Sequence, residues 1–200
     1  MTQDYILARL LSNNAQWAED VEKAAPGFLA DLATAQTPKV LWIGCADSRV
    51  PESVVTASKP GDIFVHRNIA NQFHLTDDSA LSVLTYAVEH VGVSHVLLVG
   101  HTNCGGAAAC AQAAKAPAAS EPASPLERWL APLTEIARTV EGEDLTALVE
   151  ANVRVQVENI ALSDVMQRAW AKGRDVQVHG WVYELESGRL RDLGVTVGKQ

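Results

Sequence analysis

Val40-Leu-Trp-Ile-Gly-Cys45-Ala-Asp47-Ser-Arg49 is the stretch that decides the fold. Its first five residues form a continuous apolar run, and such a run predicts a short β-strand that is covered on both faces. A thiol, a carboxylate and a guanidinium follow directly. A second apolar run, residues 96–100, ends in His101-Thr-Asn-Cys104-Gly-Gly. Two predicted strands therefore end in side chains that can bind a metal.

Strands and helices alternate along most of the chain. Helical patterns cover residues 51–57, 76–92, 105–114, 126–140 and 144–171, and further strands are predicted over 63–67, 176–185 and 190–197. The last two strands are expected to pair as a hairpin. The pattern predicts an α/β fold: a mostly parallel central sheet with a late antiparallel strand, flanked by helices. Ligands of such sheets gather beyond the carboxyl ends of the strands, where Cys45 and His101 fall.

Two segments lie outside this alternation. Residues 1–36 are expected to form a helical arm with breaks at Asn13-Asn14 and Pro26-Gly27. Because the arm has little core of its own to cover, we expect it to pack on a partner subunit. Residues 115–125, rich in Ala, Pro and Ser, predict an exposed loop rather than a boundary, so residues 1–200 are interpreted as a single domain.

The composition excludes several classes of protein. The net charge is −8 and the pI is near 5.2, whereas a nucleic-acid-binding protein normally has a basic face. No apolar stretch is long enough to span a membrane. The first residues resemble neither a signal peptide nor a transit peptide, and three cysteines do not make a disulfide framework. We therefore expect a cytoplasmic protein with no nucleic-acid or membrane partner.

The two strand ends together predict a zinc site. Catalytic zinc has three protein ligands, among them thiolates and imidazoles, and leaves a fourth position for water. Cys45, His101 and Cys104 meet that requirement. Cys110 lies within the Ala-rich helix and is expected to be a small core residue.

Both motifs resemble the signatures of a known family. Cys45-Ala-Asp-Ser-Arg49 and Gly100-His-Thr-Asn-Cys-Gly-Gly106 are similar to the two signatures of the β-class carbonic anhydrases. The resemblance extends through residues 61–71, 84–88 and 179–183. It implies a zinc lyase with one Zn²⁺ per subunit that interconverts carbon dioxide and bicarbonate. It also implies a homodimer or a dimer-of-dimers tetramer, and the sequence leaves that choice open.

Asp47 and Arg49 are the candidate catalytic dyad. Two thiolates offset the charge of zinc, so the bound water needs further assistance. The Asp47 carboxylate can accept a hydrogen bond from zinc-bound hydroxide and orient it, and Arg49 can hold that carboxylate through a bidentate contact. The alternative is an ordinary helix-capping Asp beside a surface Arg.

The resemblance also implies two further groups of residues. Those that match the substrate pocket are Gln36, Phe64, Ile69 and Tyr86, with the Gln36 side chain as a donor to substrate oxygen. Some of these residues would face the zinc of a partner subunit. Apart from the resemblance, the backbone N–H of Gly105 at the start of a predicted helix is a further candidate donor. Those that match a non-catalytic bicarbonate site of regulated members are Trp42, Arg67 and Tyr183. In those members, the carboxylate at the position of Asp47 leaves its arginine and becomes the fourth zinc ligand, which closes the site.

Three other readings stay open. The chain could be a non-catalytic zinc protein or bicarbonate sensor on the same scaffold, against which intact Asp47, Arg49 and Gln36 speak. It could hydrolyse an analogue of carbon dioxide such as carbon disulfide. A nucleotide-binding α/β protein is disfavoured, because bulky ligands stand in residues 100–106 where a phosphate-binding loop has glycines.

Overall fold

The computed structural model of the chain describes residues 2–117, 124–142 and 144–199. The chain divides into two compact units, Met1–Gln36 and Thr37–Gln200. Among the described residues, no helix is long and apolar enough to cross a membrane.

The N-terminal unit contains α1 (Thr2–Ala24) and α2 (Phe28–Leu32). The break predicted at Pro26-Gly27 is confirmed, and Gly27 has a left-handed backbone with φ of 84°. The break predicted at Asn13-Asn14 is wrong, because α1 runs through it. An Asn inside a helix costs only about 0.7 kcal/mol relative to Ala, and the flanking Ala, Leu, Glu and Lys residues favour the helix. Within its own unit, α1 leaves large apolar side chains uncovered: Tyr5, Ile6, Leu7, Leu10, Leu11 and Trp17.

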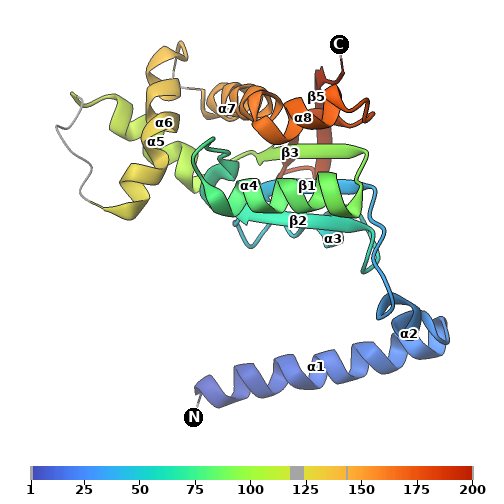
Figure 1. The fold of residues 1–200 in the computed structure, drawn as a ribbon. Helices are drawn as coiled ribbons and strands as arrows, with labels where there is room; N and C mark the ends of the chain where they lie inside the picture. Colours follow the sequence, from blue (N-terminus) through green and yellow to red (C-terminus); the bar gives the residue numbers. More distant parts are fainter. Residues whose placement is uncertain (1, 118–123, 143, 200) are drawn as a thin grey trace. The chain divides into compact units, whose positions relative to one another are not determined.

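The second unit is built on one five-stranded sheet in the order β2-β1-β3-β4-β5 (Figure 1). Its strands are β1 (Val40–Cys45), β2 (Ile63–Asn68), β3 (His95–His101), β4 (Gln177–Glu184) and β5 (Arg189–Val197). The first four are parallel, and β5 is antiparallel to β4. The predicted fold class is therefore confirmed, including the late antiparallel strand.

The register of the sheet brings the ends of the strands together. Gly44 of β1 lies opposite Val99 of β3. Cys45, which follows Gly44, and His101, which ends β3, therefore lie at the same edge of the sheet. On the outer side, Cys45 lies opposite Asn68 of β2. Parallel strands share the direction of their carboxyl ends, and this edge holds the candidate site.

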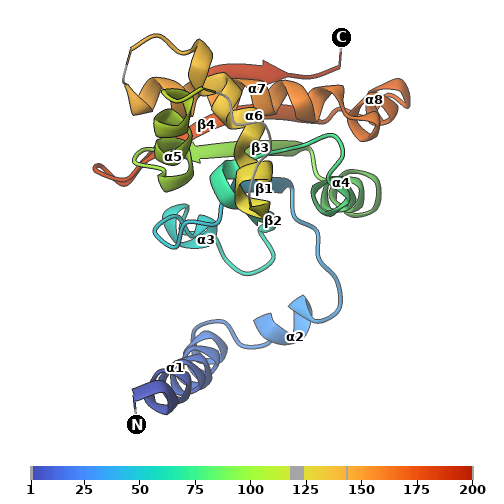
Figure 2. The ribbon, with the colours of Figure 1, turned by 90° about the vertical axis from the view of Figure 1, so that its left-hand side faces the viewer.

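Helices cover the sheet and form its main core (Figures 1 and 2). They are α3 (Glu52–Val55), η1 (Ile69–Asn71), α4 (Asp78–Thr85), η2 (Tyr86–Val91), α5 (Gly105–Ala114), α6 (Pro125–Thr139), α7 (Leu145–Leu162) and α8 (Asp164–Ala171). The main core joins alternate strand residues such as Ile43 and Leu98 to Val153 and Val157 of α7. A smaller cluster on the other face contains Trp42, Val50, Leu97, Val99 and Tyr183.

Three predicted helices differ from the structure in detail. The helix predicted over 144–171 is divided at Ser163 into α7 and α8. The helix predicted over 76–92 is capped by Asp77 and ends at Gly92, but its last turns widen into a π-helix, η2. Pro132 predicts a kink or a late start of the helix over 126–140. The structure has Pro132 inside α6 without a late start, because Ser124 caps the helix and Pro125 occupies its first turn. Most of the loop predicted over 115–125, residues 118–123, lies outside the described residues.

Candidate metal centre

Cys45, His101 and Cys104 lie together at the carboxyl edge of the sheet. Cys45 ends β1, His101 ends β3, and Cys104 directly precedes α5. Their sulfur and ring-nitrogen atoms all lie within 4.8 Å of one another, and the three residues are buried. Within the part of the chain that the structure describes, no second group of three such residues could hold a metal ion. Cys110 is buried in the core on α5, as predicted.

His101 is prepared for a metal by its own neighbour. Its Nδ1 atom lies 2.8 Å from the carbonyl oxygen of Thr102. A carbonyl can only accept a hydrogen bond, so Nδ1 carries the proton and Nε2 presents its lone pair. Nε2 is buried and has no hydrogen-bond partner among the described residues. A buried ring nitrogen facing two thiols without a partner fits a metal ligand.

The two thiols share one negative charge before a metal binds. A hydrogen bond from Cys104 lowers the pKa of Cys45 to about 4, against the opposing effect of burial, and hydrogen bonds from the backbone N–H groups of Asp47 and Ala70 add to this lowering. The same contact and burial raise the pKa of Cys104. Two sulfurs and an imidazole nitrogen form a donor set suited to zinc and unsuited to magnesium or calcium.

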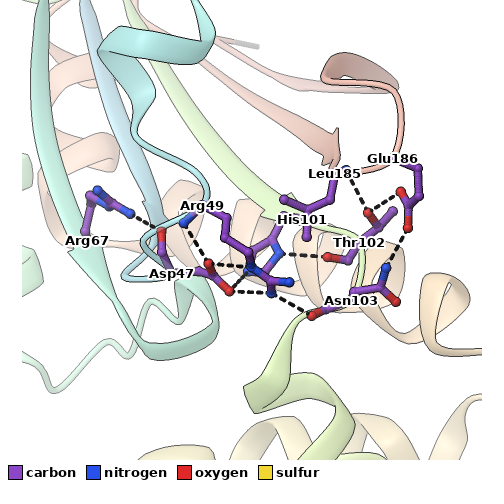
Figure 3. A network of polar contacts seen from close by, with 8 residues as sticks. All are labelled: Asp47, Arg49, Arg67, His101, Thr102, Asn103, Leu185 and Glu186. Carbon is purple, nitrogen blue, oxygen red and sulfur yellow. Dashed lines mark hydrogen bonds and ion pairs between the residues drawn. The ribbon is translucent and has the colours of Figure 1, made fainter.

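Asp47 and Arg49 make the bidentate contact that the sequence predicts (Figure 3). Arg49 donates from Nε to Oδ1 of Asp47 at 3.0 Å, and a terminal nitrogen donates to Oδ2 at 2.7 Å. The backbone N–H of Arg49 also donates to Oδ1, at 2.9 Å. These hydrogen bonds hold the pKa of Asp47 well below its usual range. Oδ2 of Asp47 is 3.8 Å from Nε2 of His101, so the carboxylate borders the ligand cluster.

The residues predicted for the substrate pocket are brought together only in part. Phe64 stacks on Tyr86, with ring centroids 5.8 Å apart. Ile69 packs near the first turn of α5, because a Cβ built on Gly106 would lie 3.3 Å from Ile69 Cγ2. Gly105, beside it, has open space where a side chain would be. Gln36 belongs to the N-terminal unit.

The predicted bicarbonate residues lie in the smaller core cluster or opposite Gly44 on β2. Trp42 is buried, and its indole N–H has no partner in the described chain. A Cβ built on Gly44 would lie 2.3 Å from that nitrogen. Arg67, opposite Gly44 on β2, donates to the carbonyl oxygens of Cys45 at 2.9 Å and Asp47 at 2.6 Å. Tyr183 is buried in the same cluster as Trp42.

Several contacts at the site have no signal in the sequence. Arg67 also faces Glu52, with 3.7 Å between the charged atoms. Arg49 also donates to the carbonyl oxygen of Asn103 at 3.2 Å, and Glu186 binds the side chain of Asn103 (Figure 3). Asn103 lies inside the predicted ligand motif, so the sequence points to it. Glu186 is an acidic residue beside a hairpin turn, and no sequence pattern marks it as part of the site.

Known proteins resemble this chain over nearly its whole length. The model of a family described as carbonic anhydrase matches residues 40–190. A carbonic anhydrase of Emericella nidulans is 36% identical over 196 residues, which cover 94% of this chain and 83% of that protein. A tetrameric β-carbonic anhydrase from the filamentous ascomycete Sordaria macrospora superimposes with a TM-score of 0.85 at 35% identity, covering 96% of this chain and 99% of that one. A Coccomyxa β-carbonic anhydrase in complex with acetazolamide gives a TM-score of 0.86 at 32% identity, covering 96% and 87%.

Proposed function

Because the chain belongs to the β-carbonic anhydrase family, whose members are lyases that hydrate carbon dioxide, we propose that Cys45, His101 and Cys104 bind one Zn²⁺ for this reaction. The observation that carries the assignment is the buried, unpartnered Nε2 of His101 beside two thiols. Bound zinc supplies a Lewis acid that brings the pKa of water to near 7. Carbon dioxide is a weak electrophile and needs such a nucleophile at neutral pH.

In this proposal Asp47 and Arg49 act as a dyad on the attacking water. The low pKa of Asp47 keeps its carboxylate ionised, so it can accept a hydrogen bond from the water and aim the lone pair at the substrate. Arg49 holds the carboxylate at two atoms, which fixes its direction as well as its charge. The distance of 3.8 Å between Oδ2 of Asp47 and Nε2 of His101 supports a position of the carboxylate beside the proposed metal ligands.

The substrate pocket is proposed beside this dyad. Phe64, Ile69 and Tyr86 supply apolar surface for carbon dioxide, and the N–H of Gly105 at the start of α5 is a donor to its oxygen. Ile69 and Tyr86 are 42% and 50% exposed, so their outer surfaces are open to solvent or to a partner. Gln36 is the proposed second donor, from its own chain or from a partner subunit.

Bicarbonate regulation is proposed at Trp42, Arg67 and Tyr183. The buried Trp42 N–H without an acceptor supports an anion there, and Arg67 supplies positive charge. Since Arg67 holds the carbonyls of Cys45 and Asp47, its movement would reach the ligand loop directly. Bicarbonate or low pH would then favour an inactive state in which Asp47 leaves Arg49 and is the fourth residue that holds the metal. Activity that is flat across pH 7 to 8.5 and insensitive to added bicarbonate would contradict this regulation.

A homodimer or a dimer-of-dimers tetramer is the proposed assembly, in the cytoplasm, with carbon dioxide and bicarbonate as the ligands. The uncovered apolar side chains of α1 support packing on a second subunit. The relative from Sordaria macrospora is tetrameric. The three cysteines are free thiols, which suits a reducing compartment.

The test of the proposed function is stopped-flow hydration of carbon dioxide against pH, with zinc content measured on the same sample. We expect about one zinc per chain and rapid hydration that is lost when a chelator removes the metal. One zinc per chain without hydration would contradict the enzyme and favour a sensor. Hydrolysis of carbon disulfide in place of hydration would assign the site to the analogue.

A further inference from the structure

Glu186 joins the β4–β5 hairpin to the loop that carries two of the proposed zinc ligands (Figure 3). Its Oε2 atom accepts a hydrogen bond from the hydroxyl of Thr102 at 2.8 Å. Its Oε1 atom accepts one from the side-chain amide of Asn103 at 2.5 Å. The backbone N–H of the preceding residue, Leu185, donates to the Thr102 hydroxyl at 2.9 Å. The hairpin therefore binds both residues that separate His101 from Cys104.

Both of those residues use their carbonyl groups at the site. The Thr102 carbonyl fixes the proton of His101 on Nδ1, and the Asn103 carbonyl accepts a hydrogen bond from Arg49. Asn103 has a left-handed backbone, with φ of 52°, which few residues other than Gly, Asn and Asp adopt readily. The direction of these carbonyls depends on this left-handed turn. The Glu186 carboxylate binds the side chains of both Thr102 and Asn103 in that turn.

We propose that Glu186 is a positioning residue for carbon dioxide hydration, which holds Thr102 and Asn103 so that His101 and Arg49 keep their working orientation. This inference rests on the proposed function, because it assigns Glu186 a role only through the metal site and the Asp47–Arg49 dyad. Glu186 itself touches neither the ligand atoms nor the dyad.

The hairpin is a suitable anchor because it is fixed independently of the site. β4 and β5 pair from Val178–Val197 to Glu184–Arg189, and the backbone N–H of Gly188 closes the turn on the backbone carbonyl of Glu184 at 2.8 Å. Glu186 lies on this turn as an acceptor in an ionised state, since hydrogen bonds from its own backbone N–H, Thr102 and Asn103 lower its pKa. A rigid, charged acceptor holds two donors in one geometry better than water does.

The test is a double-mutant cycle that exchanges the two groups. Glu186→Gln turns an amide toward Asn103 and loses an acceptor, while Asn103→Asp opposes two carboxylates and keeps a residue that tolerates the left-handed turn. The double variant restores one amide and one carboxylate with the net charge unchanged. We expect each single variant to lower kcat by about 10- to 100-fold, as for residues that support metal ligands, and the double variant to recover most of it.

A second readout is the visible absorption spectrum of the cobalt-substituted protein, which reports ligand geometry without turnover. We expect its bands to shift in both single variants and to return in the double variant. Glu184→Gln is the matched control, because it removes hydrogen bonds within the same hairpin but does not contact residues 102–103. This control should keep the wild-type kcat and spectrum.

Three results would overturn the role of Glu186: wild-type kcat and spectrum in both single variants, no recovery in the double variant, or an equal loss in Glu184→Gln. All three presuppose a wild-type protein that binds zinc and hydrates carbon dioxide. Failure of the wild-type protein itself would instead contradict the proposed function, so the two failures are separate.

Discussion

Arg49 is the residue that orients the Asp47 carboxylate in the proposed dyad. It meets Asp47 with two side-chain nitrogens and a backbone N–H, and it is itself tied to Asn103. The guanidinium is exposed, so its contribution to overall stability is small, because water screens surface ion pairs. Its contribution to orientation is larger, since a bidentate contact leaves the carboxylate one direction. Loss of the dyad should therefore affect catalysis more than folding.

Variants of the dyad test this separation. We expect Asp47→Asn and Arg49→Ala to lower carbon dioxide hydration by about 100-fold, the size of a lost general acid–base group, while zinc content stays near one per chain. Ser48→Ala is the matched control, because Ser48 lies between the two residues and is exposed. Stopped-flow rates and metal analysis on the same samples give both quantities. Near-normal hydration in either dyad variant would remove that residue from the mechanism.

Among the structural elements, η1 carries strain that α7 compensates. Ala70 and Asn71 have left-handed backbones, with φ of 60° and 47°, and such a conformation costs a non-glycine residue about 1–2 kcal/mol. The carbonyl of Ala70 accepts hydrogen bonds from Gln72 at 2.8 Å and from Asn152 of α7 at 3.0 Å. Gln156 of α7 accepts the N–H of Phe73 at 2.9 Å. This buried amide network fixes η1 between β2 and the first turn of α5.

Removal of Asn152 should therefore be costly. Asn152→Leu leaves the Ala70 carbonyl and the amides of Gln72 and Gln156 short of partners, so we expect a loss of about 2–4 kcal/mol in the free energy of unfolding. Urea unfolding of the zinc-loaded protein measures it. Asn159→Leu, at a half-buried position on the same helix, should cost less. Asn159 also donates to Gln156, so equal losses in the two variants would show that Asn152 contributes no more to the network than the half-buried Asn159.

The uncovered apolar side chains of α1 give a prediction about assembly. Leu10 is one of them, and helical spacing places Ser12 on the opposite side of the helix from Leu10. We expect Leu10→Glu to lower the oligomeric state, and Ser12→Glu, which adds the same charge, to leave it unchanged. Analytical ultracentrifugation at several protein concentrations distinguishes the species. An unchanged assembly in Leu10→Glu would place the subunit contact elsewhere.

The elements also show what a sequence can predict. Continuous apolar runs predicted β1 and β3, because burial on both faces selects for such runs, and alternation with a turn at Ser187-Gly188 predicted β4 and β5. The unbroken α1 and the π-helical turns of η2 were not predictable, since local propensities differ there by less than tertiary packing contributes. The three candidate ligands could be predicted because each of their two motifs is local in the sequence. Glu186 could not, because it is 83 residues from Asn103 and only the β3–β4 pairing brings them together.

Over the whole molecule, half-buried histidines should make stability depend on pH. Burial lowers the pKa of His66, His74 and His179. The unfolded chain then binds more protons than the folded one below the ordinary histidine pKa of about 6.5, so stability is full above that pH and falls with acidification. We expect the thermal midpoint to drop between pH 7.5 and 5.5. His74→Phe, which keeps an aromatic ring in contact with Trp129, should flatten the slope, and a slope unchanged by this variant would contradict the assignment.

The proposed zinc-dependent hydration depends on the buried cluster of Cys45, His101 and Cys104. Its most direct test is the zinc content of Cys45→Ala and Cys104→Ala beside Cys110→Ala, with hydration rates from the same samples. Cys110 is an equally buried free thiol outside the cluster, so it controls for the loss of a buried sulfur. We expect loss of zinc and hydration in the first two variants and one zinc per chain with hydration in the third. Full zinc and activity in Cys45→Ala or Cys104→Ala would contradict the proposed zinc site.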